Sequence, residues 1–158
     1  MRFVLDTIPG ASCVATRWDL GIDNVSVRTG ALGSVYCLSR ANSTGGRARL
    51  TGIGSRVAAD EDVTLAVSSL PADSFGYFLM SELTAVIPVH EGDLCLGGEV
   101  KRFSMDVIRS GPEGLVQFSP DFNALPMGSV FRPGDTWNFQ YWYRDVGPTT
   151  NFSEALSV

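Results

Sequence analysis

The fold of this chain is decided by one stretch, Gly134-Asp135-Thr136-Trp137-Asn138-Phe139-Gln140-Tyr141-Trp142-Tyr143-Arg144-Asp145. Successive side chains of an extended strand point to opposite faces. One face therefore carries four aromatic residues: Trp137, Phe139, Tyr141 and Tyr143. The opposite face carries Asn138, Gln140, Trp142 and Arg144. The pattern predicts a central strand with an aromatic core face and a second face that is polar except for one Trp.

Outward from this stretch, the chain consists of short alternating segments separated by Gly, Pro and Asp turns. Val63, Leu65 and Val67 are expected to point inward from one such strand. A second strand is expected over Glu99–Ile108, with three inward residues: Phe103, Met105 and Val107. About nine strands, with no 11-residue stretch of helical period, predict an all-β fold, an antiparallel, jelly-roll-like β-sandwich.

The length of 158 residues fits a single domain. Residues 1–30 are interpreted either as the tail of an upstream module or as a strand pair added to this one. The beginning, Met1-Arg2-Phe3-Val4-Leu5-Asp6, is not a signal peptide, because its apolar run is three residues long. We expect a piece of a longer secreted protein, with a cytosolic protein as the alternative.

Composition and charge argue against two classes of partner. The chain has 12 basic and 17 acidic residues, a net charge of −5, and no basic run. Nucleic-acid binding needs a concentrated positive surface, so no nucleic-acid partner is expected. No apolar run approaches the roughly 18–20 residues that span a bilayer, so no membrane insertion is expected either.

The three cysteines allow two interpretations. A disulfide between Cys37 and Cys95 would stabilise the fold by about 3–4 kcal/mol in the loop-entropy model. The alternative is three buried thiols, which a protein core tolerates well. In the first case Cys13 has no partner within the chain. No Cys pair has zinc-ligand spacing, and the single His90 cannot complete a zinc site with them.

A short motif near the N-terminus resembles a known class of module. Residues 22–27, Ile-Asp-Asn-Val-Ser-Val, are similar to the closing strand of carbohydrate-binding jelly-roll modules. In some of those modules the Asp helps to hold a structural calcium ion, and the resemblance implies that role for Asp23. Asp23 and Asn24 at a polar edge or turn are the alternative. No other cofactor is expected.

Residues 35–158 carry a longer set of spaced motifs. They are Tyr36-Cys37, Asn42-Ser43-Thr44-Gly45, Ser74-Phe75-Gly76-Tyr77-Phe78, Gly92-Asp93-Leu94-Cys95-Leu96-Gly97-Gly98, Thr136–Gln140 with Trp142–Asp145, and Asn151-Phe152-Ser153. Together they resemble an uncharacterised C-terminal domain of large secreted or cell-surface bacterial proteins. The resemblance implies an extracellular or cell-surface location and a paired Cys37 and Cys95. It implies no activity.

The catalytic patterns that we sought are missing from the sequence. A serine hydrolase needs Ser, His and an acid in one site, but the only His is His90 in a loop, and no Gly-x-Ser-x-Gly motif occurs. The acidic residues lie mostly in turns, without the neighbourhood of a glycosidase pair. No Gly-rich phosphate loop opens a helix. We therefore expect a protein that is not an enzyme.

Binding is the function that the sequence favours. An exposed Trp142 flanked by Asn138, Gln140 and Arg144 has the composition of a sugar-binding platform, in which a ring stacks on a pyranose and polar groups bond its hydroxyls. The alternative is that Trp142 is covered by a loop or a second sheet. We predict a non-catalytic extracellular module for adhesion or binding to a polysaccharide or cell-surface glycan. The second hypothesis is a structural stalk, anchor or fibre subunit that self-associates through strand edges.

Overall fold

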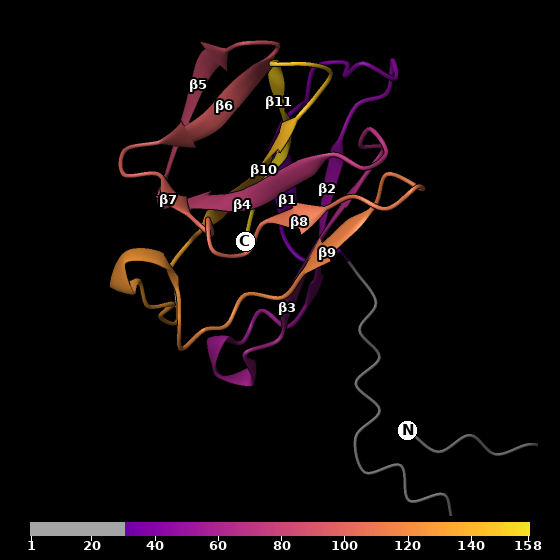
Figure 1. Cartoon of the computed structure of the whole chain (residues 1–158). Coiled ribbons are helices and arrows are strands. Elements are labelled where there is room, and N and C mark those ends of the chain that lie inside the picture. Colours follow the sequence, from indigo (N-terminus) through magenta and orange to yellow (C-terminus); the bar gives the residue numbers. More distant parts are fainter. Residues whose placement is uncertain (1–30) are drawn as a thin grey trace, which may run out of the picture.

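Alternating apolar residues fold into antiparallel strands in the computed structural model, which describes residues 31–158 (Figure 1). In this part of the chain the only helices are two 3-10 turns, η1 (Ala58–Asp60) and η2 (Pro126–Gly128). The strands are β1 (Ser34–Cys37), β2 (Arg49–Gly54), β3 (Val63–Ser68), β4 (Phe75–Ser81), β5 (Leu83–Val89), β6 (Gly92–Gly97), β7 (Lys101–Arg102), β8 (Ile108–Arg109), β9 (Val116–Phe118), β10 (Asn138–Arg144) and β11 (Thr150–Ser157).

The stretch that decides the fold lies in the middle of the largest sheet. The strand order of that sheet is β1-β11-β10-β4-β7, and β8 also pairs with β4. On one side of β10, Phe139 is paired with Leu156 of β11, and on the other side it is paired with Met80 of β4. The prediction of a central aromatic strand is therefore confirmed.

A second sheet, in the order β2-β3-β9, packs on the aromatic face of β10. The four predicted core aromatics Trp137, Phe139, Tyr141 and Tyr143 are all at most 6% exposed. The inward residues of β3 are buried as predicted: Val63, Leu65 and Val67. The two sheets enclose one apolar core, so the predicted antiparallel β-sandwich is confirmed.

The opposite face of the large sheet is covered by the hairpin of β5 and β6, which appears at the upper left in Figure 1. Leu96 of this hairpin is buried against Leu79 of β4 and Phe152 of β11. Tyr77 and Trp142 are partly buried in the same cluster. β4 is therefore covered on both faces from Tyr77 to Met80, whereas Phe75 at its start is 50% exposed.

The expected strand over Glu99–Ile108 is interrupted, and this prediction is wrong in part. Its ends form the two-residue strands β7 and β8, with a turn between them in which Asp106 N–H donates to Phe103 O at 3.0 Å. Phe103 is buried as expected, but Met105 is 95% and Val107 55% exposed. A turn resets the direction of the following side chains, so strand alternation no longer predicts which of them point inward.

Several predictions fall in residues 1–30. Cys13, the calcium ligand Asp23 and the jelly-roll motif at 22–27 lie outside the described residues.

Candidate functional site

The predicted binding face of β10 is an interior surface. Asn138 is 2% and Gln140 1% exposed, because the β5–β6 hairpin lies over them. The expectation of an open polar platform around Trp142 is wrong, because strand alternation identifies residues that share a face but not what covers that face. The alternative of a covered Trp142 describes the structure better.

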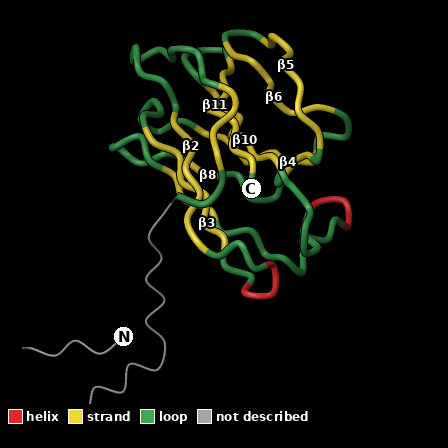
Figure 2. Tube along the Cα trace, turned by 180° about the vertical axis from the view of Figure 1, so that it is seen from behind, coloured by secondary structure: helices red, strands yellow, loops and turns green. Residues whose placement is uncertain are grey.

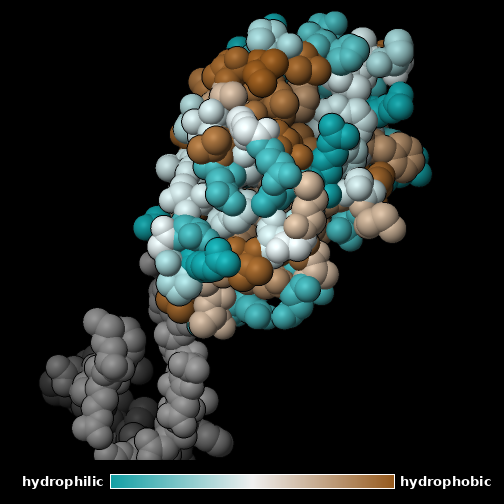
Figure 3. Space-filling model, turned by 90° about the vertical axis from the view of Figure 1, so that its left-hand side faces the viewer, coloured by the Kyte–Doolittle hydropathy of each residue, from teal (hydrophilic) through white to brown (hydrophobic). Residues whose placement is uncertain are grey.

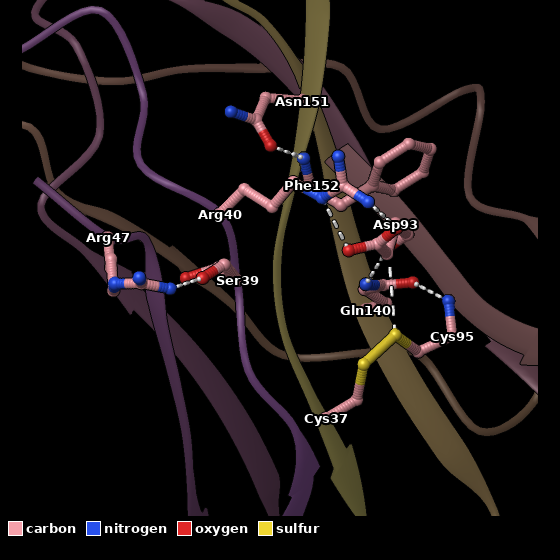
Figure 4. A network of polar contacts seen from close by, with 9 residues as sticks. All are labelled: Cys37, Ser39, Arg40, Arg47, Asp93, Cys95, Gln140, Asn151 and Phe152. Carbon is pink, nitrogen blue, oxygen red and sulfur yellow. Dashed lines mark hydrogen bonds and ion pairs between the residues drawn. A yellow bond between two sulfur atoms is a disulfide. The ribbon is translucent and has the colours of Figure 1, made fainter. Parts of the chain in front are cut away.

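Gln140 uses its whole amide inside the protein (Figure 4). Its Nε2 donates to the carbonyl oxygens of Asp93 at 2.9 Å and Ser153 at 3.0 Å, and its Oε1 accepts from Cys95 N–H at 2.9 Å. Gln140 therefore joins β10, β6 and β11. A buried amide with all these partners stabilises the packing of the hairpin, and it is not accessible to a ligand on the surface.

Asn138 is engaged in the same way at the other end of the strand. Its Nδ2 donates to Ser81 O at 3.3 Å and to Glu82 O at 3.2 Å. These carbonyls belong to the segment that leads from β4 into β5. The side chain thus supports the turn into the hairpin.

Trp142 and Arg144 lie closer to solvent than the two amides. Trp142 is half-buried against Tyr77, with ring centroids 4.8 Å apart. Arg144 is exposed, and within residues 31–158 its guanidinium has neither an ion-pair partner nor a place over the Trp142 ring. The neighbouring Asp145 carboxylate accepts from Ser43 N–H at 3.1 Å.

The predicted disulfide between Cys37 and Cys95 is confirmed. It joins β1 to β6, with the two Cα atoms 6.4 Å apart and a sequence separation of 58 (Figure 4). Next to it, the Tyr36 hydroxyl donates to Cys95 O at 2.8 Å, and burial raises the pKa of Tyr36 to about 12. Arg40 donates to both carboxylate oxygens of Asp93, at 2.7 and 2.6 Å, which raises the pKa of the guanidinium. Together these contacts hold the hairpin on the sheet.

The surface that can accept a ligand lies just before β10. Here a cavity of about 450 Å³, which we call the Trp137 hollow, opens between the two sheets. It lies near η1 and is lined by residues that include Arg56, Val57, Phe122, Phe131, Arg132 and Trp137. η1 and η2 mark this end of the sandwich in the view from behind (Figure 2). A concave apolar site with a few polar groups is the usual form of a ligand pocket.

Three aromatic rings form one wall of the hollow. The Phe131 ring meets Phe122 edge-on at 4.8 Å and Trp137 edge-on at 5.3 Å between centroids. Trp137 is held by its backbone, whose N–H and C=O both pair with Val158 at 2.9 Å. The rings are therefore fixed by packing and by the sheet, so they present a preformed surface.

The indole N–H of Trp137 is buried and has no hydrogen-bond partner among the described residues. Three hydroxyls share this condition, those of Ser39, Tyr143 and Thr150, but none of them lines the hollow. Leaving a buried donor without a partner costs about 1–3 kcal/mol, so native structures rarely do so without a reason. Because almost none of this nitrogen is open to solvent, the donor lies inside the packed wall and does not face the open part of the hollow.

A second hollow, of about 560 Å³, lies next to the first one. Residues 134–137 and Arg132 line both, and Lys101 and Glu82 belong to the second only. The Lys101 ammonium lies 5.0 Å from the centroid of the Trp137 ring, within the range of a cation–π interaction. Trp137 therefore forms part of the wall of both cavities.

Sequence reasoning missed this site for a physical reason. Alternation correctly placed Trp137 in the core, and a core residue is not an obvious ligand contact. Phe122 and Phe131 are separated from Trp137 by loop residues, whose course no periodicity predicts. One usable signal was present, since two Phe residues flank a loop rich in Gly and Pro, where exposed aromatics are less expected.

Comparisons leave the function open. The chain matches no protein-family model, no curated protein sequence and no solved structure. Within residues 31–158, no three His, Cys, Asp or Glu side chains are grouped so that they could hold a metal ion. No helix in that part is long and apolar enough to cross a bilayer.

Proposed function

We propose that this domain is a non-catalytic extracellular module that binds a polysaccharide in the Trp137 hollow. The observation that carries the proposal is a cavity of about 450 Å³ whose wall is formed by the rings of Phe122, Phe131 and Trp137. Aromatic rings favour the apolar C–H faces of sugars. This replaces Trp142 by Trp137 as the anchor of the predicted site.

Two features support an extracellular location. The disulfide joins elements far apart in the sequence, and such links persist in oxidising compartments. The motifs that resemble a C-terminal domain of secreted bacterial proteins point to the same location, with other extracellular modules nearby. Adhesion is the role that such a setting suggests.

The test compares three chains on a panel of insoluble polysaccharides. They are the native chain, Trp137→Phe and Trp142→Ala. Trp137→Phe keeps an aromatic ring in the core but shortens the aromatic wall of the hollow, so it tests the feature that carries the proposal. We expect retention of the native chain and of Trp142→Ala on at least one polysaccharide, and loss of retention for Trp137→Phe with an unchanged melting temperature.

Other outcomes identify a different site or a different function. Loss of retention only in Trp142→Ala would place the ligand on the side of the β5–β6 hairpin instead. Failure of the native chain to bind any polysaccharide would overturn the proposal and favour assembly, which is the second candidate function.

A specific observation favours assembly. β5 has no charged residue, and three of its apolar side chains are strongly exposed: Leu83 at 62%, Val86 at 69% and Ile87 at 47%. Figure 3 faces this side of the molecule and shows hydrophobic residues gathered at the upper end, where the hairpin lies. Exposed apolar surface of this kind often marks a protein–protein contact.

Assembly through this hairpin is expected to use its face more than its edge. β5 pairs only with β6, but Pro88 interrupts its row of backbone donors, as is typical of protected edges. Sedimentation of the native chain, Val86→Asp and the control Val107→Asp tests this alternative. A dimer that dissociates only in Val86→Asp supports assembly, and a monomeric native chain at all concentrations contradicts it.

A further inference from the structure

Basic side chains gather around Trp137 although the protein as a whole is acidic. The net charge is −5, but Arg56, Arg132 and Lys101 all line one or both of the two hollows. Lys101 is the only lysine in the chain. Two acids, Asp135 and Glu82, also line these hollows, so the lining of the two hollows carries a net charge of +1, opposite in sign to the charge of the whole chain, and a local positive field favours anionic ligands.

Lys101 is the most constrained of the three. Its side chain is 12% exposed, and its ammonium lies 3.9 Å from the carboxylate of Glu99, which is itself 66% exposed. An ammonium group largely removed from water needs a close counter-charge, and a distant exposed carboxylate supplies little of it. The Trp137 ring at 5.0 Å contributes attraction but no hydrogen bond.

The two guanidinium groups are also available. Within the described part of the chain, neither Arg56 nor Arg132 forms an ion pair or a side-chain hydrogen bond. Two acids, Asp135 and Glu82, also line the cavities. The Asp135 carboxylate is engaged in its own turn, where it accepts from Arg132 N–H at 3.0 Å. Of the three cations, Lys101 has one long ion pair with the exposed Glu99, and the two guanidinium groups have none among the described residues.

We infer that the ligand is an anionic polysaccharide, whose carboxylate or sulfate groups contact Lys101 and Arg132 while a sugar ring contacts Trp137. This inference rests on the proposed function and names its ligand class. Guanidinium groups bond carboxylate and sulfate oxygens in pairs, and charge-assisted bonds are stronger than neutral ones. Trp137 lies in the wall of both hollows, which places the sugar contact beside the anion contacts.

The test uses polymers that differ only in charge. Titration calorimetry compares polygalacturonate with its methyl ester, and dextran sulfate with dextran. Three variants accompany the native chain: Lys101→Met, Arg132→Gln and the control Arg49→Gln. Arg49 is exposed on β2 and lines neither hollow, so its substitution changes the net charge as Arg132→Gln does but leaves the site intact.

We expect one charged polymer to bind and its neutral counterpart to bind at least tenfold more weakly. Lys101→Met and Arg132→Gln should each weaken binding about tenfold, as expected for loss of one charge-assisted bond, whereas Arg49→Gln should not. The polymer that binds identifies the anion as carboxylate or sulfate. The dissociation constant should also rise with salt concentration.

Two results would overturn the inference, and they differ from failure of the proposed function. In the first result, a neutral and a charged polymer bind equally, and binding still depends on Trp137. The proposed polysaccharide binding would then stand, but the proposed contact with an anion would be wrong. Equal weakening by all three charge substitutions would show general attraction to a polyanion and no built site. Only the absence of binding to every polysaccharide, charged or neutral, removes the proposed function as well.

Discussion

The two faces of β10 are both buried, but by different kinds of contact. On the aromatic face, Tyr141 lies beside Phe78 of β4, and Phe78 packs on Phe118 of β9 in the second sheet, with ring centroids 5.2 Å apart. The other face packs on the β5–β6 hairpin through the Gln140 amide and the nearby disulfide. Apolar packing tolerates small adjustments, whereas an amide needs each partner in place. A polar face on a strand is therefore not by itself evidence of a surface.

The largest expected effect comes from breaking the aromatic face. Phe139→Ala removes a ring that is 2% exposed, and large-to-small changes of this kind cost about 4 kcal/mol through lost transfer energy and a cavity. Urea unfolding should show this loss. The control Leu38→Ala, at a side chain that is 69% exposed, should stay within about 0.5 kcal/mol of the native chain. Similar losses in both variants would contradict the assignment of Phe139 to the core.

Removing the disulfide is expected to weaken the other face selectively. In a Cys13→Ala background that prevents thiol exchange, Cys37→Ala with Cys95→Ala should lower the free energy of unfolding by about 3 kcal/mol, because the 58-residue link no longer restricts the unfolded chain. Hydrogen exchange should lose protection first in the hairpin and last in β10 and β11. Uniform loss of protection would show that the two faces do not open separately.

A smaller effect is expected from Gln140→Leu. Leucine fills most of the same volume, so the cost comes mainly from leaving Cys95 N–H and two carbonyls without their partner. We expect a loss of about 2 kcal/mol in urea unfolding. Gln140→Glu offers a sharper comparison, because it keeps the shape and adds a buried charge, and it should destabilise more than Leu does at neutral pH. If Gln140→Leu lowered the free energy of unfolding more than Gln140→Glu did, the result would argue against a dry interface between β10 and the hairpin.

The smallest effect concerns alkaline pH and compares one tyrosine from each side. Burial raises the pKa of Tyr36 to about 12 and the pKa of Tyr141 further above its usual value. Above pH 10 the unfolded chain releases tyrosine protons that the folded chain keeps, so the free energy of unfolding falls as pH rises from 10 towards 12.

Urea midpoints measured from pH 8 to 11 check this expectation. Tyr36→Phe and Tyr141→Phe should each reduce the alkaline slope by a similar amount, because both tyrosines stay protonated in the folded chain over this range. The slope is expected to be flat below pH 9 in all three chains. An unchanged slope in both variants would mean that other groups cause the alkaline loss.

Much of the framework follows from the sequence, for a reason visible in particular residues. Phe139 and Tyr141 in β10 and Leu65 and Val67 in β3 alternate strictly, and each strand is long enough for alternation to identify its buried side. The disulfide was one of two interpretations of the cysteines, and the fold brings Cys37 and Cys95 together across 58 residues.

The remaining features depend on long-range placement, which alternation does not contain. Nothing around Gln140 in the sequence shows that β6, about 45 residues away, supplies the backbone groups it bonds. Met105 lies within a turn that interrupts the strand alternation. The Trp137 hollow is assembled from six separate segments of the chain, and the sequence does not show that these segments lie close together in space.

The Cys37–Cys95 link has a mechanical consequence. Among the strands, β1 pairs only with β11, and Ser34 lies opposite Ser157. Residues 31 and 158 therefore lie at the same end of the domain. Tension between these ends would break the hydrogen bonds of that strand pair one after another. A strand pair resists such sequential loading less than it resists loading of all its hydrogen bonds at once. The covalent bond at Cys37 stops this opening at the end of β1 and passes the load to β6. If pulled from these ends, the domain would lose the contacts of Leu32 and the four residues of β1, and the disulfide would protect the packing beyond Cys37.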